Sequence, residues 1–158
     1  MKLYIKQKVW SWTDKFTIKD PDGHDRYSAK GDFSIWRRLH VYDAQGSEVI
    51  FIEQKHWTMM PCFRVHVGGQ QVAEVKQRFR WTRQSFEIGG TDWSVEGNWH
   101  GHDYEVTSEA RGCIVRIAKE WMTWGDSYEL DIDNPEDELL ALAVVLAIDC
   151  ANSVSSNS

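Results

Sequence analysis

The chain has 158 residues, enough for one domain that buries a substantial core without disulfides or metals. Hydrophobic residues make up 42% and charged residues 27%, as in an ordinary globular protein. The net charge of −6 and the pI near 5.5 argue against general nucleic-acid binding, which needs a basic domain, so we expect no nucleic-acid partner.

The acidity is concentrated near the end of the chain. From Asp126 to Ser158 there are eight acidic residues and no Lys or Arg, whereas residues 1–125 carry 16 acidic and 18 basic residues. Most of the chain is therefore close to neutral, with local basic stretches. The nine tryptophans favour β structure, because large flat side chains suit pleated surfaces.

The cysteines and the N-terminus indicate a cytoplasmic protein. Cys62, Cys113 and Cys150 lie far apart and form no CxxC pair, which predicts reduced, buried thiols. Residues 1–8 (MKLYIKQK) carry charges where a signal peptide would be apolar, so we expect no export signal.

After a first strand predicted near residues 3–10, turn glycines recur at a nearly constant spacing. They stand at Gly23, Gly46, Gly69, Gly90 and Gly112, which are 23, 23, 21 and 22 residues apart. Tight hairpin turns need positive φ values, and Gly supplies them. The segments that flank the turns alternate apolar and polar residues, as half-buried strands do. The apolar positions include Phe16/Ile18, Leu39/Val41, Phe63/Val65/Val67, Phe86/Ile88, Trp93/Val95 and Tyr104/Val106.

Consecutive hairpins of this kind predict about twelve antiparallel strands without an intervening helix. A flat sheet of that size would leave exposed edges, and closure into a barrel removes them. The alternative, a propeller, needs about 40 residues per blade, so this chain would supply too few blades. The sequence therefore predicts a mainly β fold with a closed barrel.

The last part of the chain predicts one hydrophobic helix over residues 135–151. Asn134 is a suitable N-cap, Pro135 suits the first helical position, and residues 139–148 are all apolar. A helix that is apolar on every face must be buried, and ten apolar residues fall short of the roughly 20 that a membrane span needs. We therefore expect no transmembrane segment. Instead, we expect a helix about 25 Å long inside the barrel. Residues 152–158 should form a flexible tail.

Several short strings in this order resemble the LURP-one-related family. They stand at residues 4–9 (YIKQKV), 14–20 (DKFTIKD), 39–43 (LHVYD), 72–76 (VAEVK), 95–98 (VEGN), 104–106 (YEV), 127–130 (SYEL) and 147–149 (AID). The resemblance spans nearly the whole chain. It implies a fold like the tubby C-terminal domain, a twelve-stranded barrel around a central hydrophobic helix.

The resemblance implies little about activity, because family members largely lack an assigned one. Tubby domains bind phosphoinositide headgroups through basic residues of the barrel surface, and related scramblase-like proteins meet membranes. No tubby headgroup motif aligns with this chain, so no site residue is transferred from it, and a function inferred from the fold alone is analogy.

Two basic clusters are candidate sites for an anionic headgroup or phosphate. On one strand, Lys76, Arg78 and Arg80 share a face while Gln77, Phe79 and Trp81 share the other, and Arg83 follows. If the aromatic residues face inward, the cations form an outer ladder that suits phosphate oxygens. The alternative is a solvated strand face paired with neighbouring glutamates. The second cluster, Arg37 and Arg38, follows Trp36.

Three further features have competing interpretations. Trp57, Met59 and Met60 in a loop before Pro61 either contact a membrane or partner, or cap the open end of the barrel, which we favour. His100, His102 and Asp103 are metal-ligand types, but a tetrahedral site needs more ligands nearby, so we expect no metal. Asp149, the one charge in the apolar stretch, should pair with a cation or lie at the barrel mouth, and we expect it to anchor the helix.

No motif for a nucleophile, a nucleotide or another cofactor occurs, and a helix in the lumen removes the usual barrel cavity, so we expect neither catalysis nor a cofactor. The favoured hypothesis is a binding module that acts through surface cations on an anionic lipid headgroup or phosphate, cytoplasmic or peripheral at a membrane. The alternatives are a protein-interaction adaptor or structural protein without a small ligand, and an enzyme of unrecognised chemistry. No pattern defines an oligomeric state.

Overall fold

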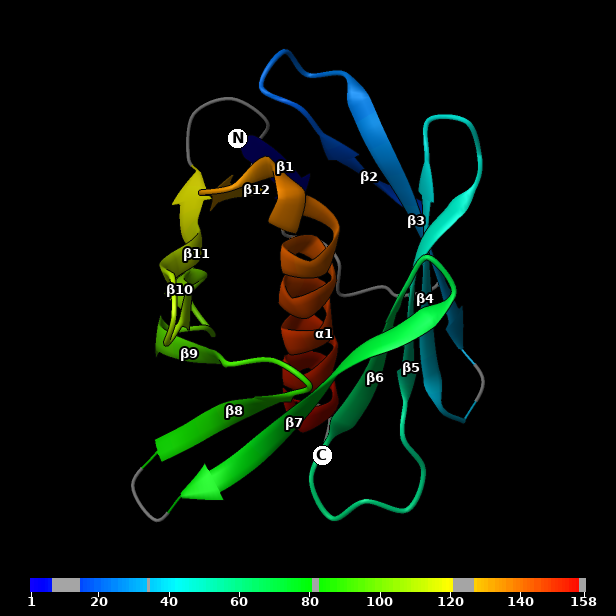
Figure 1. Ribbon diagram of the computed structural model, residues 1–158. Coiled ribbons are helices and arrows are strands. Elements are labelled where there is room, and N and C mark those ends of the chain that lie inside the picture. Colours follow the sequence, from blue (N-terminus) through cyan, green and yellow to red (C-terminus); the bar gives the residue numbers. More distant parts are fainter. Residues whose placement is uncertain (7–14, 34, 81–82, 121–126, 157–158) are drawn as a thin grey trace.

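Every turn glycine joins two antiparallel neighbours of one continuous barrel (Figure 1). The computed structural model describes residues 1–6, 15–33, 35–80, 83–120 and 127–156. Within that part the strands are β1 (Lys2–Lys6), β2 (Lys15–Lys19), β3 (Asp25–Phe33), β4 (Arg37–Asp43), β5 (Glu48–Gln54), β6 (Cys62–Val67), β7 (Gln70–Arg80), β8 (Arg83–Gly89), β9 (Trp93–Asn98), β10 (Asp103–Ser108), β11 (Gly112–Glu120) and β12 (Ser127–Ile132).

The described strands pair in chain order, and β1 closes the barrel by pairing with β12 from Lys2↔Asp131 to Lys6↔Ser127. This confirms the predicted closed antiparallel barrel of about twelve strands. The closure is weakest between β8 and β9, which pair only at Glu87↔Ser94 among the described residues and diverge from there (Figure 1).

Because consecutive strands run in opposite directions, the connections between them lie at the two ends of the barrel. The turns with Gly23, Gly46, Gly69, Gly90 and Gly112 all follow strands that run the same way, so they lie at one end, here called the turn end. The spacing of about 22 residues thus corresponds to one up-and-down pair of strands. Residues 35–36, 55–61 and 99–102, which stand between β3 and β4, β5 and β6, and β9 and β10, lie at the opposite end, here called the loop end.

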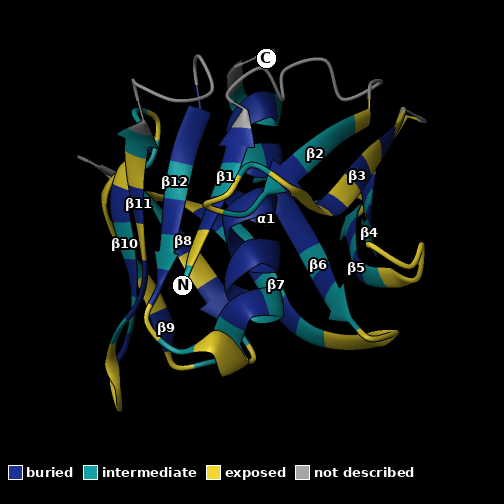
Figure 2. Cartoon of the chain, turned by 90° about the horizontal axis from the view of Figure 1, so that it is seen from above, coloured by how far each residue is buried: buried dark blue, intermediate teal, exposed yellow. Residues whose placement is uncertain are grey.

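A single helix, α1 (Glu138–Ser156), runs through the barrel from the turn end to the loop end, as predicted (Figure 1). It follows a short 3-10 turn, η1 (Pro135–Asp137), whose N-cap Asn134 accepts a hydrogen bond from the backbone N–H of Glu136 at 3.0 Å. The helix packs mainly against β5, β6 and β7, and its residues from Ala141 to Ile148 are completely buried (Figure 2). Barrel wall and helix therefore form one core.

By length and composition alone, Pro135–Ser155 would suffice to cross a membrane, with a mean hydropathy of 1.7. However, 72% of the apolar window is buried inside the barrel, so its hydrophobicity is used for the core.

The helix is longer than the sequence predicted. We expected a flexible tail from residue 152, but α1 continues to Ser156, and Asn152 and Ser153 are buried. Serine hydroxyls bond to the preceding turn, from Ser153 to the Cys150 carbonyl at 2.8 Å and from Ser155 to the Ala151 carbonyl at 3.2 Å. From the sequence alone, polar residues that are hydrogen-bonded at the barrel mouth cannot be distinguished from the polar residues of a frayed helix end.

Candidate functional site

Four large hydrophobic side chains, here called the apolar tips, are exposed among the described residues. Ile35 is 90% exposed, Trp57 92% and Phe79 69%, and Met59 is fully exposed. All four belong to the loop end, because they lie between β3 and β4, between β5 and β6, and near the end of β7. Large apolar side chains that project from one end of a barrel are typical of an interaction surface.

The loop between β5 and β6 holds Trp57 outward. Trp57 has a positive φ of 59°, an uncommon backbone conformation for a bulky residue. The neighbouring His56 ring stacks on Trp36 with ring centroids 4.5 Å apart, and Trp36 meets Trp57 edge to face at 6.0 Å. The favoured prediction that this loop caps the barrel is therefore wrong for Trp57 and Met59. Met60 is half-buried and, together with Met59, lines a pocket.

The predicted cation ladder on β7 is only partly present. Gln77 faces the lumen and accepts a hydrogen bond from Ser155 of the helix at 2.6 Å, but Phe79 is exposed, so the aromatic residue does not point inward. At the end of the strand little lumen remains for an inward side chain to fill. Arg78 is ion-paired with Glu87 of β8. The side chains of Arg80 and Arg83, and the whole of Trp81, lie outside the described residues.

The arginines of the second cluster point to opposite sides of β4. Arg38 is exposed, whereas Arg37 shares the inner face with the buried Leu39 and is half-buried at the barrel mouth. The Arg37 guanidinium donates to the Ser153 hydroxyl near the end of α1. Lys55 in the next loop and Lys76 on β7 add positive charge at the same end; Lys55 lies 3.5 Å from the Glu74 carboxylate.

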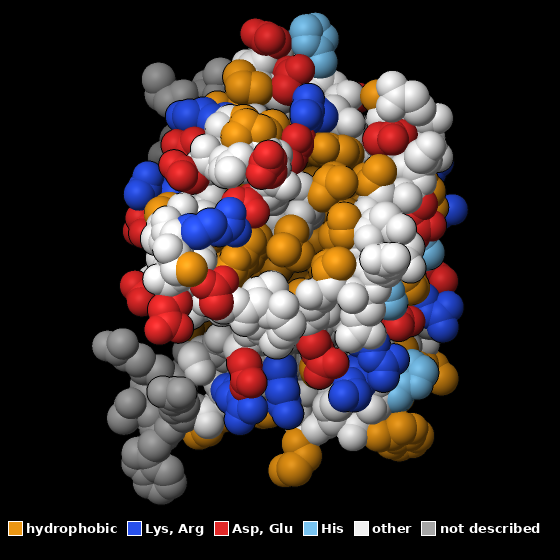
Figure 3. Space-filling model, in the orientation of Figure 1, with side chains coloured by type: hydrophobic (Ala, Val, Ile, Leu, Met, Phe, Trp, Pro, Cys, Tyr) orange, Lys and Arg blue, Asp and Glu red, His pale blue; other side chains and the backbone are white. Residues whose placement is uncertain are grey.

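The two ends of the barrel thus differ in charge (Figure 3). Exposed acidic residues of the turn end include Asp22, Asp92, Glu109, Asp133 and Glu136, while Arg26 and Arg111 near that end are paired with Glu138 and Asp137. In Figure 3, Asp and Glu outnumber Lys and Arg over the upper part of the molecule, whereas Lys and Arg with interspersed Asp and Glu form a row near the lower end, and hydrophobic side chains project below that row. The basic residues of this end and the apolar tips form one surface, here called the basic rim: Ile35, Arg37, Arg38, Lys55, Trp57, Met59, Lys76, Arg78 and Phe79.

Asp149 lies deeper in the same half of the barrel, in a buried polar cluster. Its carboxylate accepts hydrogen bonds from the Tyr128 hydroxyl and, at 3.2 Å, from His102 Nε2. The His102 ring stacks on Tyr128 with centroids 4.1 Å apart, and its backbone has a positive φ of 51°. Within the described chain, His102 Nδ1 and the buried Tyr104 hydroxyl have no hydrogen-bond partner. The predicted pairing of Asp149 therefore involves His102 and a phenol rather than Lys or Arg.

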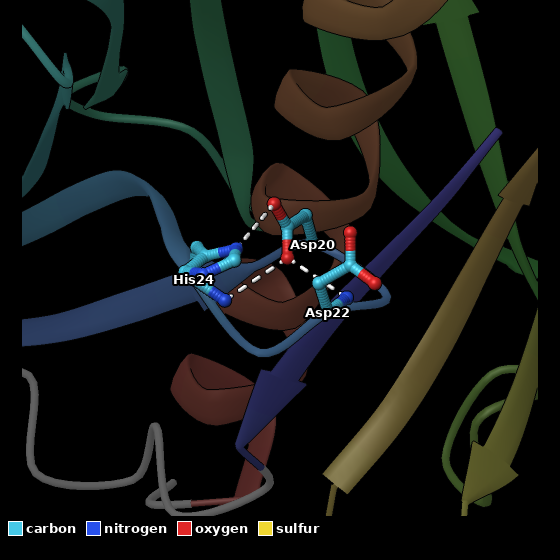
Figure 4. Close-up of side chains that lie close together, drawn as sticks. All are labelled: Asp20, Asp22 and His24. Atoms are coloured by element: carbon cyan, nitrogen blue, oxygen red, sulfur yellow. Dashed lines mark hydrogen bonds and ion pairs between the residues drawn. The ribbon is translucent and has the colours of Figure 1, made fainter.

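Neither group of metal-ligand types forms a convincing metal centre in the described chain. His102 turns inward to Asp149, while His100 and Asp103 are exposed. Asp20, Asp22 and His24 cluster in the turn between β2 and β3 (Figure 4). Asp20 Oδ1 already accepts the backbone N–H groups of Asp22 and His24, both at 2.9 Å.

The turn between β4 and β5 is built in the same way without a histidine. There Asp43 Oδ1 accepts the N–H groups of Gln45 at 3.0 Å and Ser47 at 2.9 Å. The matching geometry indicates that the acidic residue in both turns serves to form the hairpin.

The three cysteines are free thiols, with Cys62 and Cys150 buried. Burial, and next the bond that its thiol donates to Glu74, raise the pKa of Cys62 to about 12. Burial raises the pKa of Cys113 and Cys150 as well. These thiols are poor nucleophiles at neutral pH, because the thiolate is the reactive form.

Sequence reasoning missed Ile35, Lys55 and Phe79 as members of the rim. Ile35 lies between β3 and β4 and Lys55 directly after β5, and neither belongs to a recognisable motif. Strict alternation along the strand assigned Phe79 to the inner face of the barrel. The topology could have identified these residues, because the loops that join consecutive hairpins must all lie at the same end of a closed barrel.

Comparisons with known proteins agree with this fold. The sequence model of the LURP-one-related family matches residues 1–149. The uncharacterized protein YxjI of Bacillus subtilis is 31% identical over 150 residues, which cover 94% of this chain and 92% of YxjI. A crystal structure of an Arabidopsis thaliana protein superposes with a TM-score of 0.66 at 18% identity, covering 94% of this chain and 90% of the other.

Proposed function

The chain belongs to the LURP-one-related family, and we propose that it is a non-enzymatic module that docks on an anionic membrane surface with its basic rim. The observation that carries the proposal is the coincidence of two features at one end of the barrel. The apolar tips project there, and Arg38, Lys76 and Arg78 lie beside them, while the opposite end is acidic.

The chemistry of the rim suits a bilayer interface better than water. Trp is enriched where a membrane meets water, because its ring is apolar and its N–H is polar. Transferring an exposed side chain such as Trp57 or Met59 out of water contributes roughly 1.5–3 kcal/mol. Each Lys or Arg close to an anionic surface contributes about 1 kcal/mol at moderate ionic strength. Together these contributions are sufficient for reversible peripheral binding.

The charge distribution also defines an orientation. An anionic surface attracts the basic rim and repels the acidic turn end, so the barrel axis stands on the membrane with the end of α1 nearest to it. Ion pairs such as Arg78–Glu87 reduce the attraction on the flank of the barrel. The apolar tips therefore decide whether binding persists when salt screens the charges.

Co-sedimentation with vesicles tests this function. The protein should sediment with phosphatidylserine-containing vesicles at low salt and much less with phosphatidylcholine vesicles or at high salt. The double variant Arg38→Gln/Lys76→Gln should bind about 25-fold more weakly, from about fivefold per lost charge. The matched control Lys2→Gln/Arg111→Gln removes two positive charges near the turn end and should bind like the parent protein.

Absence of binding to any vesicle would contradict the proposal. In that case the apolar tips point to a protein partner, and the adaptor function becomes the better account. Equal losses in both double variants would show that net charge, rather than the rim, governs binding.

A further inference from the structure

Arg37 is a half-buried cation without a carboxylate partner in the described part of the chain. Its side chain enters the barrel mouth from the inner face of β4 and reaches the buried Ser153 hydroxyl. Burial lowers the pKa of the Arg37 guanidinium. The neighbouring Arg38 is exposed and points away from the mouth. Of the two adjacent arginines, Arg37 is thus the one held in a poorly solvated position.

The contacts of Arg37 leave most of its hydrogen-bonding capacity unused. A guanidinium has five N–H donors, and Ser153 Oγ is its side-chain acceptor among the described residues. The nearby end of α1 offers only the partial negative charge of a helix C-terminus, equivalent to about half a unit. Buried charges in proteins are normally paired in full. Arg37 is only half-buried, so a role limited to capping the helix leaves several of its N–H donors available to an anion at the barrel mouth.

A pocket of about 350 Å³ opens at the loop end next to this arginine. Gln54, a wall residue, accepts the backbone N–H of Arg37 at 3.2 Å, and Val154 and Ser155 on the other wall follow Ser153 in the helix. The remaining walls are formed by Trp36, Thr58, Met59, Met60 and Pro61. Five of the eight wall residues are apolar, and one of them is an apolar tip, Met59. Arg37 is not itself a wall residue; it is bonded to the wall residue Gln54 and to Ser153, which precedes the wall residues Val154 and Ser155.

We propose that this pocket receives one phospholipid of the membrane surface, with the lipid phosphate bound by Arg37 and the adjoining glycerol and acyl segment against Trp36, Met60 and Val154. The proposal rests on the proposed function. It adds to the basic rim a site that binds one lipid molecule per protein. Arginine is suited to the task, because its planar fork matches phosphate oxygens. The pocket volume lies within the range usual for small-ligand sites.

Short-chain lipids test the site separately from membrane docking. Dioctanoyl phosphatidic acid, used as monomers and measured by isothermal titration calorimetry, should bind with a stoichiometry of one. Glycerol 3-phosphate and inorganic phosphate share the phosphate but lack the acyl part, so they should bind at least about tenfold more weakly. Equal affinity for all three would identify a free phosphate, rather than a lipid, as the ligand.

Two adjacent arginines provide a matched pair of variants. Arg37→Gln should weaken the binding of the short-chain lipid by at least about tenfold, and Arg38→Gln by less than about twofold. Both remove one charge, but only Arg37→Gln also removes the phosphate contact of the bound lipid, so it should lower vesicle binding at least as much as Arg38→Gln. Because Arg37→Gln also removes a contact to the helix, Thr58→Phe serves as a second variant, which fills the pocket from a loop and leaves Arg37 in place.

The outcomes are distinct. Loss of short-chain lipid binding in Arg37→Gln and in Thr58→Phe, with folded protein by circular dichroism, supports the site. Equal effects of Arg37→Gln and Arg38→Gln, or full binding by Thr58→Phe, would overturn it. No saturable binding of the short-chain lipid by a protein that sediments with anionic vesicles would also overturn it, while the proposed function would stand.

Discussion

Tyr128, the second residue of β12, donates its hydroxyl hydrogen to the Asp149 carboxylate of α1; the tyrosine is buried in the core, and the Asp149 side chain is only 9% exposed. Burial, and next the carboxylate itself, raise the pKa of Tyr128 well above its ordinary value, so the phenol remains a donor at neutral pH. This bond connects the apolar helix to the barrel at one defined height and rotation. Apolar contacts alone specify such a position less strictly.

Asp149→Leu should therefore lower the free energy of unfolding by about 3 kcal/mol, because it leaves Tyr128 and His102 buried without their acceptor. Thermal unfolding should also broaden as the helix loses its fixed position. Adding Tyr128→Phe removes the orphaned hydroxyl, so the double variant should cost less than the sum of the two single variants. Unchanged thermal unfolding of Asp149→Leu would refute the anchoring role.

At low pH the folded protein should lose the stabilisation that the Glu138 carboxylate provides at the turn end. Burial pushes the pKa of Glu138 upward, but hydrogen bonds from Arg26 and Tyr27 outweigh burial and hold the pKa below its ordinary value. A carboxyl with a depressed pKa in the folded state stabilises the protein above the unfolded pKa of about 4.3, and this stabilisation is lost as the pH falls through the lower folded value.

Glu138→Gln keeps the shape of the side chain and removes the charge. It should be about 1–2 kcal/mol less stable than the parent protein at pH 7. The difference should shrink steadily below about pH 4, when the parent carboxyl also becomes neutral. Urea unfolding at several pH values measures it, and a difference independent of pH would contradict the assignment.

Two turn glycines should differ in their tolerance to alanine. Gly46 and Gly90 have positive φ values of 83° and 87°, so each alanine variant incurs the cost of a left-handed residue, about 1–2 kcal/mol. A Cβ atom at Gly46 meets no atom within 4 Å, whereas at Gly90 it would lie 2.8 Å from the Val72 carbonyl oxygen. Gly90→Ala should therefore be clearly less stable than Gly46→Ala in thermal unfolding, and equal melting temperatures would contradict this account.

The sequence was informative where the physical requirement is local and repeated. Glycine turns such as Gly23 and Gly46 need positive φ values, and the apolar run from Leu139 to Ile148 has to be buried, so the barrel and its internal helix follow from the pattern. Residues at the barrel mouth were harder to predict. Alternation determines on which face of a strand a residue lies. Near the end of β7, however, the inner face extends beyond the lumen, so Phe79 on that face is exposed.

Contacts between distant segments could not be derived from spacing. His102 reaches Asp149 because its turn adopts a positive φ and directs the ring inward, and nothing in the string HGHD indicates this. Likewise, the different roles of Arg37 and Arg38 depend on the register of β4 at the mouth of the barrel. The basic rim emerged only once the topology brought its loops together.

The central claim, that the loop end faces the membrane, is tested most directly by a fluorescent label. In a Cys113→Ser background, an environment-sensitive dye is attached at Met59→Cys, with Gln45→Cys in an exposed turn of the other end as the control. On anionic vesicles the dye at position 59 should shift to shorter wavelength and be quenched by lipids with nitroxide-labelled acyl chains, while the dye at position 45 stays unchanged. A vesicle-bound protein in which position 59 remains in water, or position 45 enters the lipid, would contradict the account.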